Sequence, residues 1–240
     1  MSGHSKWSTI KRQKGKTDAA RAKIFTKIGR EVAVAIKMGG VDTQTNSRLR
    51  DCIAKARAAN MPNENITRFI KKASGELDSI NYEHVLYEGY GVCGSAVIVE
   101  ALTDNKNRTA GEVRHIFDKY GGALGANGCV QYLFEKKGVM IVDKTIINQT
   151  EDEFVLLCLD YAVEDVLVEQ DEYIIYTSAI EFGQTHKSLL EKGIVFLSAQ
   201  VDRVPKDKVQ LDADSLNKFE NMLDKFEESE DIQEVYHNVK

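Results

Sequence analysis

The chain has 240 residues, a net charge of −5 and a hydrophobic content of 42%, enough for packed cores in one or two domains, or three small ones. No apolar run of 18 residues occurs, so we expect no membrane-spanning helix, and the basic N-terminus lacks the apolar stretch of a secretory signal. The four cysteines and five histidines are scattered, which predicts reduced thiols in a cytoplasmic protein and neither a metal site nor a cofactor.

The charge is divided unevenly along the sequence. Residues 1–80 hold 17 basic and 7 acidic side chains, whereas residues 81–240 hold 15 and 30. A basic segment on an acidic body attracts polyanions to one end of a molecule. A solvated tail or polar helix face is the ordinary explanation of a charge run, but Trp7 lies among these cations with few apolar neighbours, which suits base stacking. The nucleic-acid contacts expected here are Lys6, Trp7, Lys11, Arg12, Lys14, Lys16, Arg21, Lys23, Lys27 and Arg30.

Three apolar stripes at helical spacing predict three helices in this basic segment. Their bounds are Thr17 or Asp18 to Gly39, Asn46 or Ser47 to the residue before Pro62, and Asn63 or Asn65 to Gly75. Together they predict a small helical bundle over residues 1–80. Its outer faces carry seven basic residues, for which solvated surface and nucleic-acid contact are both open: Arg48, Arg50, Lys55, Arg57, Arg68, Lys71 and Lys72.

Strands and helices alternate in the acidic remainder of the chain. A strand is expected over 95–101, then a helix with a capping box of Thr109 and Glu112, then a strand over 130–134. The next pieces follow the order strand, helix, strand, strand, helix, strand that is typical of a ferredoxin-like fold. They are 139–142, 152–161, 165–168, 173–176, 182–191 and 195–201. A helix bearing Leu216, Phe219, Leu223 and Phe226 and a last strand over 235–239 complete the chain.

The sequence resembles the YebC family along its whole length. The resemblance rests on SGHSKWSTIKRQKGKTDAARAKIFTKIGREV at 2–32, YEGYG at 87–91, EALTDNKNRTAGEVRHIFDKYGGALGANGCV at 100–130 and EVYHNV at 234–239. Val92-Cys93 stands where the family pattern has Pro-Gly, which leaves the local turn open. The resemblance implies a helical bundle and two α+β domains, the third inserted in the second. Periodicity and resemblance together predict a multidomain α and α+β protein: a three-helix bundle (1–80), a split α+β domain (81–137 with 205–240) and an inserted ferredoxin-like domain (138–204).

Three patterns typical of enzymes have simpler explanations here. The G-x-G-x-x-G match at 89–94 precedes a strand, whereas a dinucleotide-binding loop follows a strand and opens a helix, so we interpret it as a turn. The glycine-rich loop at 121–128 lacks the Lys-Ser or Lys-Thr of a phosphate-binding P-loop. Cys129 and His115 lack a third orienting group, which favours a buried thiol and a surface imidazole over a catalytic pair. We expect no enzyme and no small-molecule substrate.

The loop at 121–128 has two open interpretations. A tight connection between helix and strand explains its glycines, but such a backbone also lets a partner approach closely, and two cations precede it. The second possible contact therefore comprises Lys106, Arg108, Gly122, Gly125 and Gly128. Residues 138–204 hold 4 basic and 13 acidic side chains, so we expect them to repel phosphate and to meet a protein partner.

The function expected is regulation of gene expression through nucleic acid. The resemblance implies either a translation factor acting on RNA, with the ribosome as the expected target, or a DNA-binding transcriptional regulator, and does not choose between them. A lysine-rich arm with one aromatic residue, and a bundle without a recognition helix or a heptad seam for dimers, favour RNA. An enzyme is the third and least favoured alternative.

Overall fold

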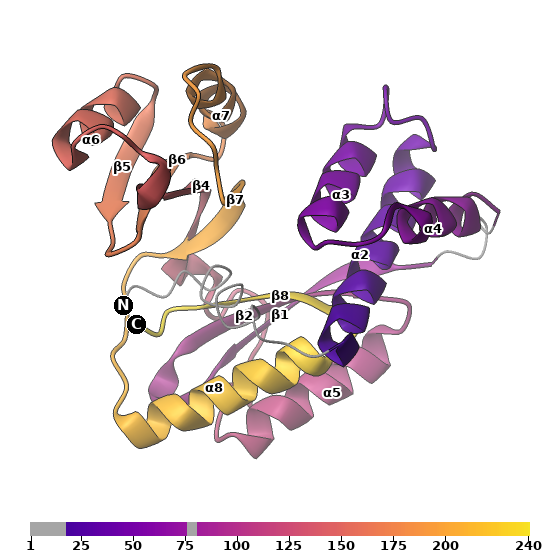
Figure 1. Cartoon of the computed structure of the whole chain (residues 1–240). Coiled ribbons are helices and arrows are strands. Elements are labelled where there is room, and N and C mark those ends of the chain that lie inside the picture. Colours follow the sequence, from indigo (N-terminus) through magenta and orange to yellow (C-terminus); the bar gives the residue numbers. More distant parts are fainter. Residues whose placement is uncertain (1–17, 76–80) are drawn as a thin grey trace. The chain divides into compact units, whose positions relative to one another are not determined.

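The computed structural model describes residues 18–75 and 81–240, and these fall into two compact units. The inserted unit comprises Tyr132–Lys208. The main unit comprises the described residues before Tyr132 together with Val209–Val239. Two antiparallel sheets and their helices make the chain a mixed α+β protein, as predicted (Figure 1). The finer division into three domains stays a prediction, because the helical bundle and the split domain form one unit.

Three helices form the bundle at the start of the main unit: α2 (Asp18–Gly39), α3 (Ser47–Ala58) and α4 (Asn63–Gly75). The apolar stripe of α2 packs Ile28, Val32 and Ile36 against residues of the other two helices in a shared core. Buried Asn46 caps α3 by accepting a hydrogen bond from the Leu49 amide, and its side chain also donates to carbonyls at the end of α2. The three predicted helices are confirmed.

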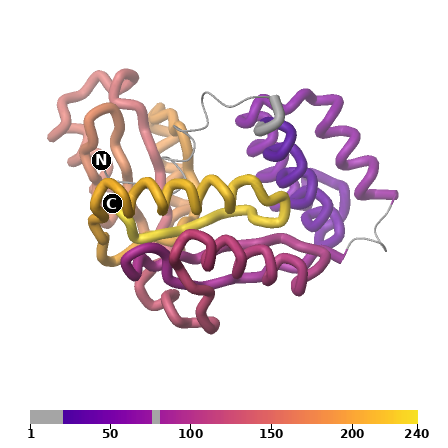
Figure 2. The backbone as a smooth tube through the Cα atoms, turned by 90° about the horizontal axis from the view of Figure 1, so that it is seen from below, coloured from indigo at the N-terminus to yellow at the C-terminus, as the bar shows by residue number. Residues whose placement is uncertain are grey.

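A four-stranded sheet forms the rest of the main unit, in the order β3-β1-β2-β8. Its strands are β1 (Glu83–Tyr90), β2 (Ala96–Thr103), β3 (Ala123–Leu124) and β8 (Ile232–His237). Helices α5 (Lys106–Lys119) and α8 (Ala213–Glu228) lie side by side across one face (Figure 2). Their Phe117 and Phe226 rings meet edge to face at 5.3 Å within the core, which fixes the two helices against each other.

The inserted unit follows the predicted order of strand, helix, strand, strand, helix, strand. The elements are β4 (Phe134–Asp143), α6 (Glu151–Leu159), β5 (Val163–Val168), β6 (Glu172–Ser178), α7 (Phe182–Glu191) and β7 (Ser198–Pro205), with short 3-10 turns at Gln131–Leu133 and Lys144–Ile146. The sheet order is β5-β6-β4-β7, all antiparallel. Met140, Phe154 and Ile175 are fully buried in its core. No described helix has the length and apolar content needed to cross a bilayer.

Two predictions of local structure are wrong and one strand was not predicted; long-range contacts explain the two errors. The expected strand over 130–134 is a 3-10 turn that leads into β4, because the amides of Val130 and Gln131 donate to the Glu88 carboxylate and not to a neighbouring strand. The expected capping box fails because α5 begins earlier, at Lys106, capped by the Asn105 side chain, while Thr109 turns inward. β1 was not expected as a strand at all.

Candidate nucleic-acid interface

The nine cations and the tryptophan predicted at the N-terminus lie partly beyond what the structure describes. Lys6, Trp7, Lys11, Arg12, Lys14 and Lys16 are outside the described residues. Arg21, Lys23, Lys27 and Arg30 lie along α2. Lys27 Nζ donates to the Glu227 carbonyl at 3.1 Å, and Arg30 turns toward the same C-terminal segment. Lys27 and Arg30 of α2 therefore contact the C-terminal segment of the main unit and are only partly available to a ligand.

Arg30 is largely enclosed by its partners, with only 15% of its side chain exposed. Its guanidinium pairs with the Asp231 carboxylate and donates to the Glu230 carbonyl at 2.9 Å. It also lies 5.4 Å from the centre of the Tyr82 ring, within range of a cation–π interaction. Arg30 thus joins the bundle to the turn that precedes β8.

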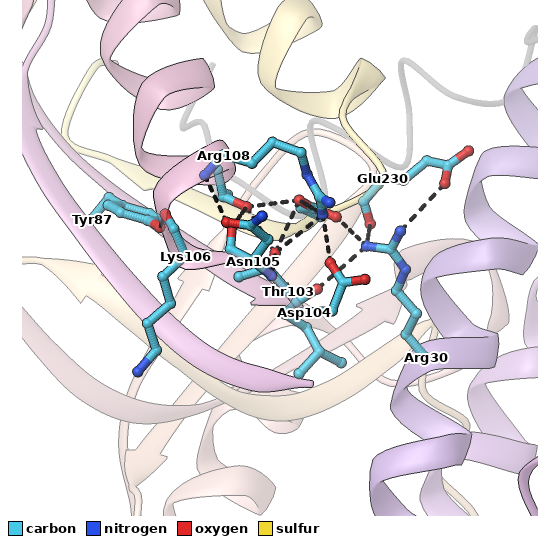
Figure 3. A network of polar contacts seen from close by, with 11 residues as sticks. Arg30, Tyr87, Thr103, Asp104, Asn105, Lys106, Arg108 and Glu230 are labelled. Atoms are coloured by element: carbon cyan, nitrogen blue, oxygen red, sulfur yellow. Dashed lines mark hydrogen bonds and ion pairs between the residues drawn. The ribbon is translucent and has the colours of Figure 1, made fainter. Parts of the chain in front are cut away.

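Asp231 belongs to a polar network that no local sequence pattern indicates; Figure 3 shows its partners Arg30, Thr103 and Arg108. Besides Arg30, its carboxylate accepts hydrogen bonds from Arg108 at 2.8 Å, Thr109 at 2.7 Å and Thr103 at 3.1 Å. Burial alone would raise the pKa of this carboxyl, but the hydrogen bonds from Arg108, Thr109 and Arg30 outweigh burial and hold the pKa at about 2. The carboxylate is therefore charged at any physiological pH and binds α2, α5 and β2 together.

The two cations predicted beside the glycine-rich loop have partners within the main unit. Lys106 Nζ lies 2.5 Å from a Glu83 carboxylate oxygen, and both side chains are more than half exposed. Arg108 pairs with Asp231 and, at 2.7 Å, with Asp104, and these hydrogen bonds raise its pKa further above its ordinary value. Lys106 is thus held only by an exposed ion pair, whereas Arg108 is tied to the buried Asp231 carboxylate, and a partner contact at either residue stays a prediction.

The glycine-rich loop is held against β1 by a second buried carboxylate. Glu88 is 3% exposed, and its side chain accepts hydrogen bonds from the amides of Gly128 at 2.7 Å, Val130 at 3.0 Å and Gln131 at 2.9 Å. The Gly125 amide donates to the Glu88 carbonyl. These contacts support the interpretation of a tight connection; the stretch at 125–128 is nevertheless exposed, and a partner contact there stays a prediction.

Close packing explains the individual glycines of this loop. A Cβ atom on Gly122 would lie 2.5 Å from the Tyr90 carbonyl oxygen, and one on Gly125 would lie 2.5 Å from the Cys129 sulfur. Gly128 has φ +86°, which L-residues with side chains rarely adopt. Gly122 is therefore required by its backbone neighbour and Gly128 by its conformation, whereas a side chain at Gly125 would require the Cys129 side chain to move.

Replacing Glu88 with alanine should loosen this loop and destabilise the protein by about 2–3 kcal/mol, because the buried Val130 amide would lose its acceptor while water could reach Gly128 and Gln131. Hydrogen exchange of the amides at 128, 130 and 131 should accelerate, and urea denaturation should measure the loss. Glu83→Ala on the same strand, at an exposed site, should change stability by less than about 0.5 kcal/mol. Unchanged exchange at these three amides would show that another contact holds the loop.

The outer face of the bundle presents several cations to solvent. Of the seven basic residues identified there, Arg48 contacts His84 and Met38, Arg50 donates to carbonyls of the preceding turn, and Lys55 pairs with Glu31 at 2.6 Å. The exposed remainder is Arg57, Arg68, Lys71 and Lys72. Three of these lie on α4 at helical spacing, where they form a basic edge suited to phosphate.

The groups considered for catalysis are poorly suited to it. Burial raises the pKa of the Cys129 thiol, with the Glu88 carboxylate adding to the effect, so the thiolate nucleophile is disfavoured. His115 is exposed on α5. The G-x-G-x-x-G match forms the end of β1 and a 3-10 turn (Val92–Gly94) before β2, which confirms the interpretation as a turn. Among the described residues no group of three His, Cys, Asp or Glu side chains could hold a metal ion.

Comparison with known proteins places the chain in a family. Residues 5–76 match the model of the TACO1/YebC protein N-terminal domain, and residues 82–239 match that of the TACO1/YebC second and third domain. The chain belongs to the TACO1/YebC family. The recognition made from the sequence is thereby confirmed.

Relatives of this TACO1/YebC chain match it from end to end. A protein of Clostridium botulinum (strain Eklund 17B) is 54% identical over 241 residues, covering 100% of this chain and 97% of its own, and one of Acetivibrio thermocellus is 52% identical over 239 residues, covering 99% and 98%. Both are named "Probable transcriptional regulatory protein". The crystal structure of a conserved hypothetical protein from Aquifex aeolicus superimposes with a TM-score of 0.84 at 43% identity, covering 98% of this chain and 97% of that one.

Proposed function

We propose that this chain is a nucleic-acid-binding regulator of gene expression that acts without catalysing a reaction. The distribution of charge carries the proposal. The bundle segment is basic and exposes Arg57, Arg68, Lys71 and Lys72, whereas the inserted unit is strongly acidic. A polyanion is attracted to the first and repelled by the second. The N-terminal residues Lys6 to Lys16 would add phosphate contacts, and Trp7 would stack on a base.

We further propose that the target is RNA, and specifically the ribosome during translation. An acidic body leaves little surface for a long duplex to follow, whereas a folded RNA can receive a basic arm in a groove while the acidic unit meets a protein. On this proposal the three predicted domains have separate tasks: the bundle and arm bind RNA, and the inserted domain binds protein. The protein would work in the cytoplasm.

A DNA-binding transcriptional regulator is the second candidate, and the names of the relatives favour it. Two direct measurements distinguish the RNA candidate from the DNA candidate. We expect the protein to co-sediment with ribosomes in a sucrose gradient at low salt and to leave them at high salt. A genome-wide map of bound DNA should then show no sequence-specific sites. Tight binding at defined DNA sites without ribosome association would overturn the RNA proposal and support the transcriptional one.

Lys106 offers a more local test of the ribosome proposal. Lys106→Glu should weaken co-sedimentation with ribosomes and leave binding to duplex DNA unchanged, because the proposed second contact is used only on the ribosome. Arg108 is unsuitable for this test, since it pairs with buried Asp231 and its reversal would disturb the fold. The matched control exchanges the partners, Glu83→Lys with Lys106→Glu, and so keeps the ion pair. If both variants bind ribosomes as the wild type does, Lys106 is not a contact; equal losses on ribosomes and DNA would favour the DNA candidate.

A further inference from the structure

Three helices of the main unit converge on a cationic depression that sequence patterns do not indicate. The depression has a volume of about 390 Å³. Its cations are Lys23 of α2, Lys119 of α5 and Lys225 of α8. Its acids are Glu112 of α5 and Glu228 of α8, and the His115 and Tyr120 rings also line it. Three lysines against two glutamates leave this site positive within a body that is otherwise strongly acidic.

One carboxylate of the depression, that of Glu228, forms an ion pair with one of its lysines. Lys225 Nζ lies 2.6 Å from Glu228, and Lys119 Nζ lies 5.6 Å from the centre of the Tyr120 ring. The hydrogen bond from Lys225 lowers the pKa of Glu228, and the charges of Lys23 and Lys119 lower it further. All three cations therefore stabilise the negative charge of the same carboxylate. The Glu228 side chain is 53% exposed and can rotate into solvent, which would leave its place beside the lysines to another anion.

The depression takes Lys23 from the basic residues of α2 and adjoins a second, acidic depression. Lys23 and Lys27 are one helical turn apart, so an anionic chain that follows α2 passes the depression. A second depression shares Glu112, Glu228 and Ser229 with the first and is otherwise lined by Arg30, Asp104, Arg108, Glu230 and Asp231. Its two arginines are already paired with carboxylates, and its acids outnumber them. Phosphate is therefore favoured in the first depression and opposed in the second.

We propose that Lys23, Lys119 and Lys225 form a phosphodiester-binding site, in which a phosphate of the nucleic-acid backbone replaces the Glu228 carboxylate. Lysine ammonium groups bind phosphate as mobile point charges and require no bidentate geometry. The adjoining Tyr120 and His115 rings offer surface for the sugar or base that the phosphate carries. This inference rests on the proposed function and extends the interface from the bundle to α5 and α8.

The proposal makes opposite predictions for the lysines and for the glutamate. With full-length protein and a fluorescein-labelled single-stranded RNA of about 20 nucleotides, anisotropy between 50 and 200 mM KCl gives the salt dependence of binding. Lys119→Gln with Lys225→Gln should weaken binding and reduce the log–log slope by roughly 1.4, about 0.7 for each lost contact. Glu228→Gln should instead tighten binding a few-fold, because it removes the competing carboxylate. Lys218→Gln, an exposed lysine two turns earlier on α8, is the matched control and should change neither quantity.

The outcomes separate this site from the proposed function. If the wild type binds with a slope near −1 or not at all, the proposed function fails and this inference with it. If the wild type shows a steep slope that the double lysine variant retains, or if Glu228→Gln binds no more tightly, only the phosphodiester site is overturned. Thermal denaturation should be unchanged in all variants because every replaced group is at least two-fifths exposed or lies on the solvent side of its helix. Protection of Lys119 and Lys225, but not Lys218, from acetylation in the presence of the RNA would support the proposal directly.

Discussion

Deleting residues 2–16 should abolish nucleic-acid binding while leaving the stability of the protein unchanged. The deleted stretch carries Lys6, Lys11, Arg12, Lys14 and Lys16, and with Lys23 these make six expected phosphate contacts. Six contacts correspond to a log–log salt slope of roughly −4 on single strands and −5 on duplex DNA. These six contacts alone should weaken binding by the wild type roughly 300-fold on RNA between 50 and 200 mM salt, and the contacts proposed for Lys119 and Lys225 add to this loss.

A length-matched control separates charge from chain length in this experiment. Replacing the five basic residues of the arm by glutamine keeps all residues in place and should weaken binding almost as much as the deletion. Urea denaturation of both variants should give the wild-type midpoint, since we expect the arm to join no core. A wild-type slope near −1, or a deletion variant that binds normally, would show that the arm does not hold the nucleic acid.

Asp231→Ala should destabilise the main unit by about 3 kcal/mol, the lower end of the range for removing one partner of a buried ion pair. The lower end is expected because Arg108 keeps Asp104 and half of its side chain reaches solvent, while Arg30 and Thr109 lose a buried acceptor. Urea denaturation measures the change. Asp104→Ala also removes a carboxylate from Arg108, but an exposed one, and should cost less than about 1 kcal/mol.

The contribution of Asp231 should depend on pH in a defined direction. Its pKa in the folded protein is about 2, below the value of 3.8 that an unperturbed Asp has, so the folded state binds this proton less readily than the unfolded state. Its stabilisation is therefore complete only above about pH 5 and is lost as the pH falls through 3.8 toward 2. The difference in unfolding free energy between the wild type and Asp231→Asn should shrink over that range. A difference that stays constant down to pH 2 would contradict the network.

Local patterns in the sequence predict the helices well because each helix needs only its own apolar stripe and cap. Ile28, Val32 and Ile36 indicate the buried face of α2, and Asn46 opens α3 as expected. The errors arise where the partner is remote in sequence. Residues 130–131 form a turn because their amides donate to Glu88, and Thr109 points inward because its hydroxyl donates to Asp231. Neither carboxylate is recognisable as a partner until the chain has folded.

The candidate interface, too, could be predicted only in part from the sequence. Composition alone indicates a basic segment for nucleic acid, because charge accumulates over many residues and needs no register. It does not distinguish Arg30 and Arg108, which the fold uses for its own carboxylates, from Arg57, Lys71 and Lys72, which remain exposed. That Lys23, Lys119 and Lys225 line one depression could not be predicted either, because it depends on how three helices pack.

The discontinuity of the main unit has a consequence for the order of folding during synthesis. The inserted unit is one continuous stretch, and all of its strands exist once residue 208 has emerged. The main unit at that moment lacks α8, β8 and Asp231, so β2 has an unpaired edge and Arg30 and Arg108 lack their shared carboxylate. Domains fold as units while the chain is made. The unit encoded in the middle is thus able to fold first, and the unit that contains the N-terminal helices closes last, when the final ten residues add β8 and the acid that joins it to α2 and α5.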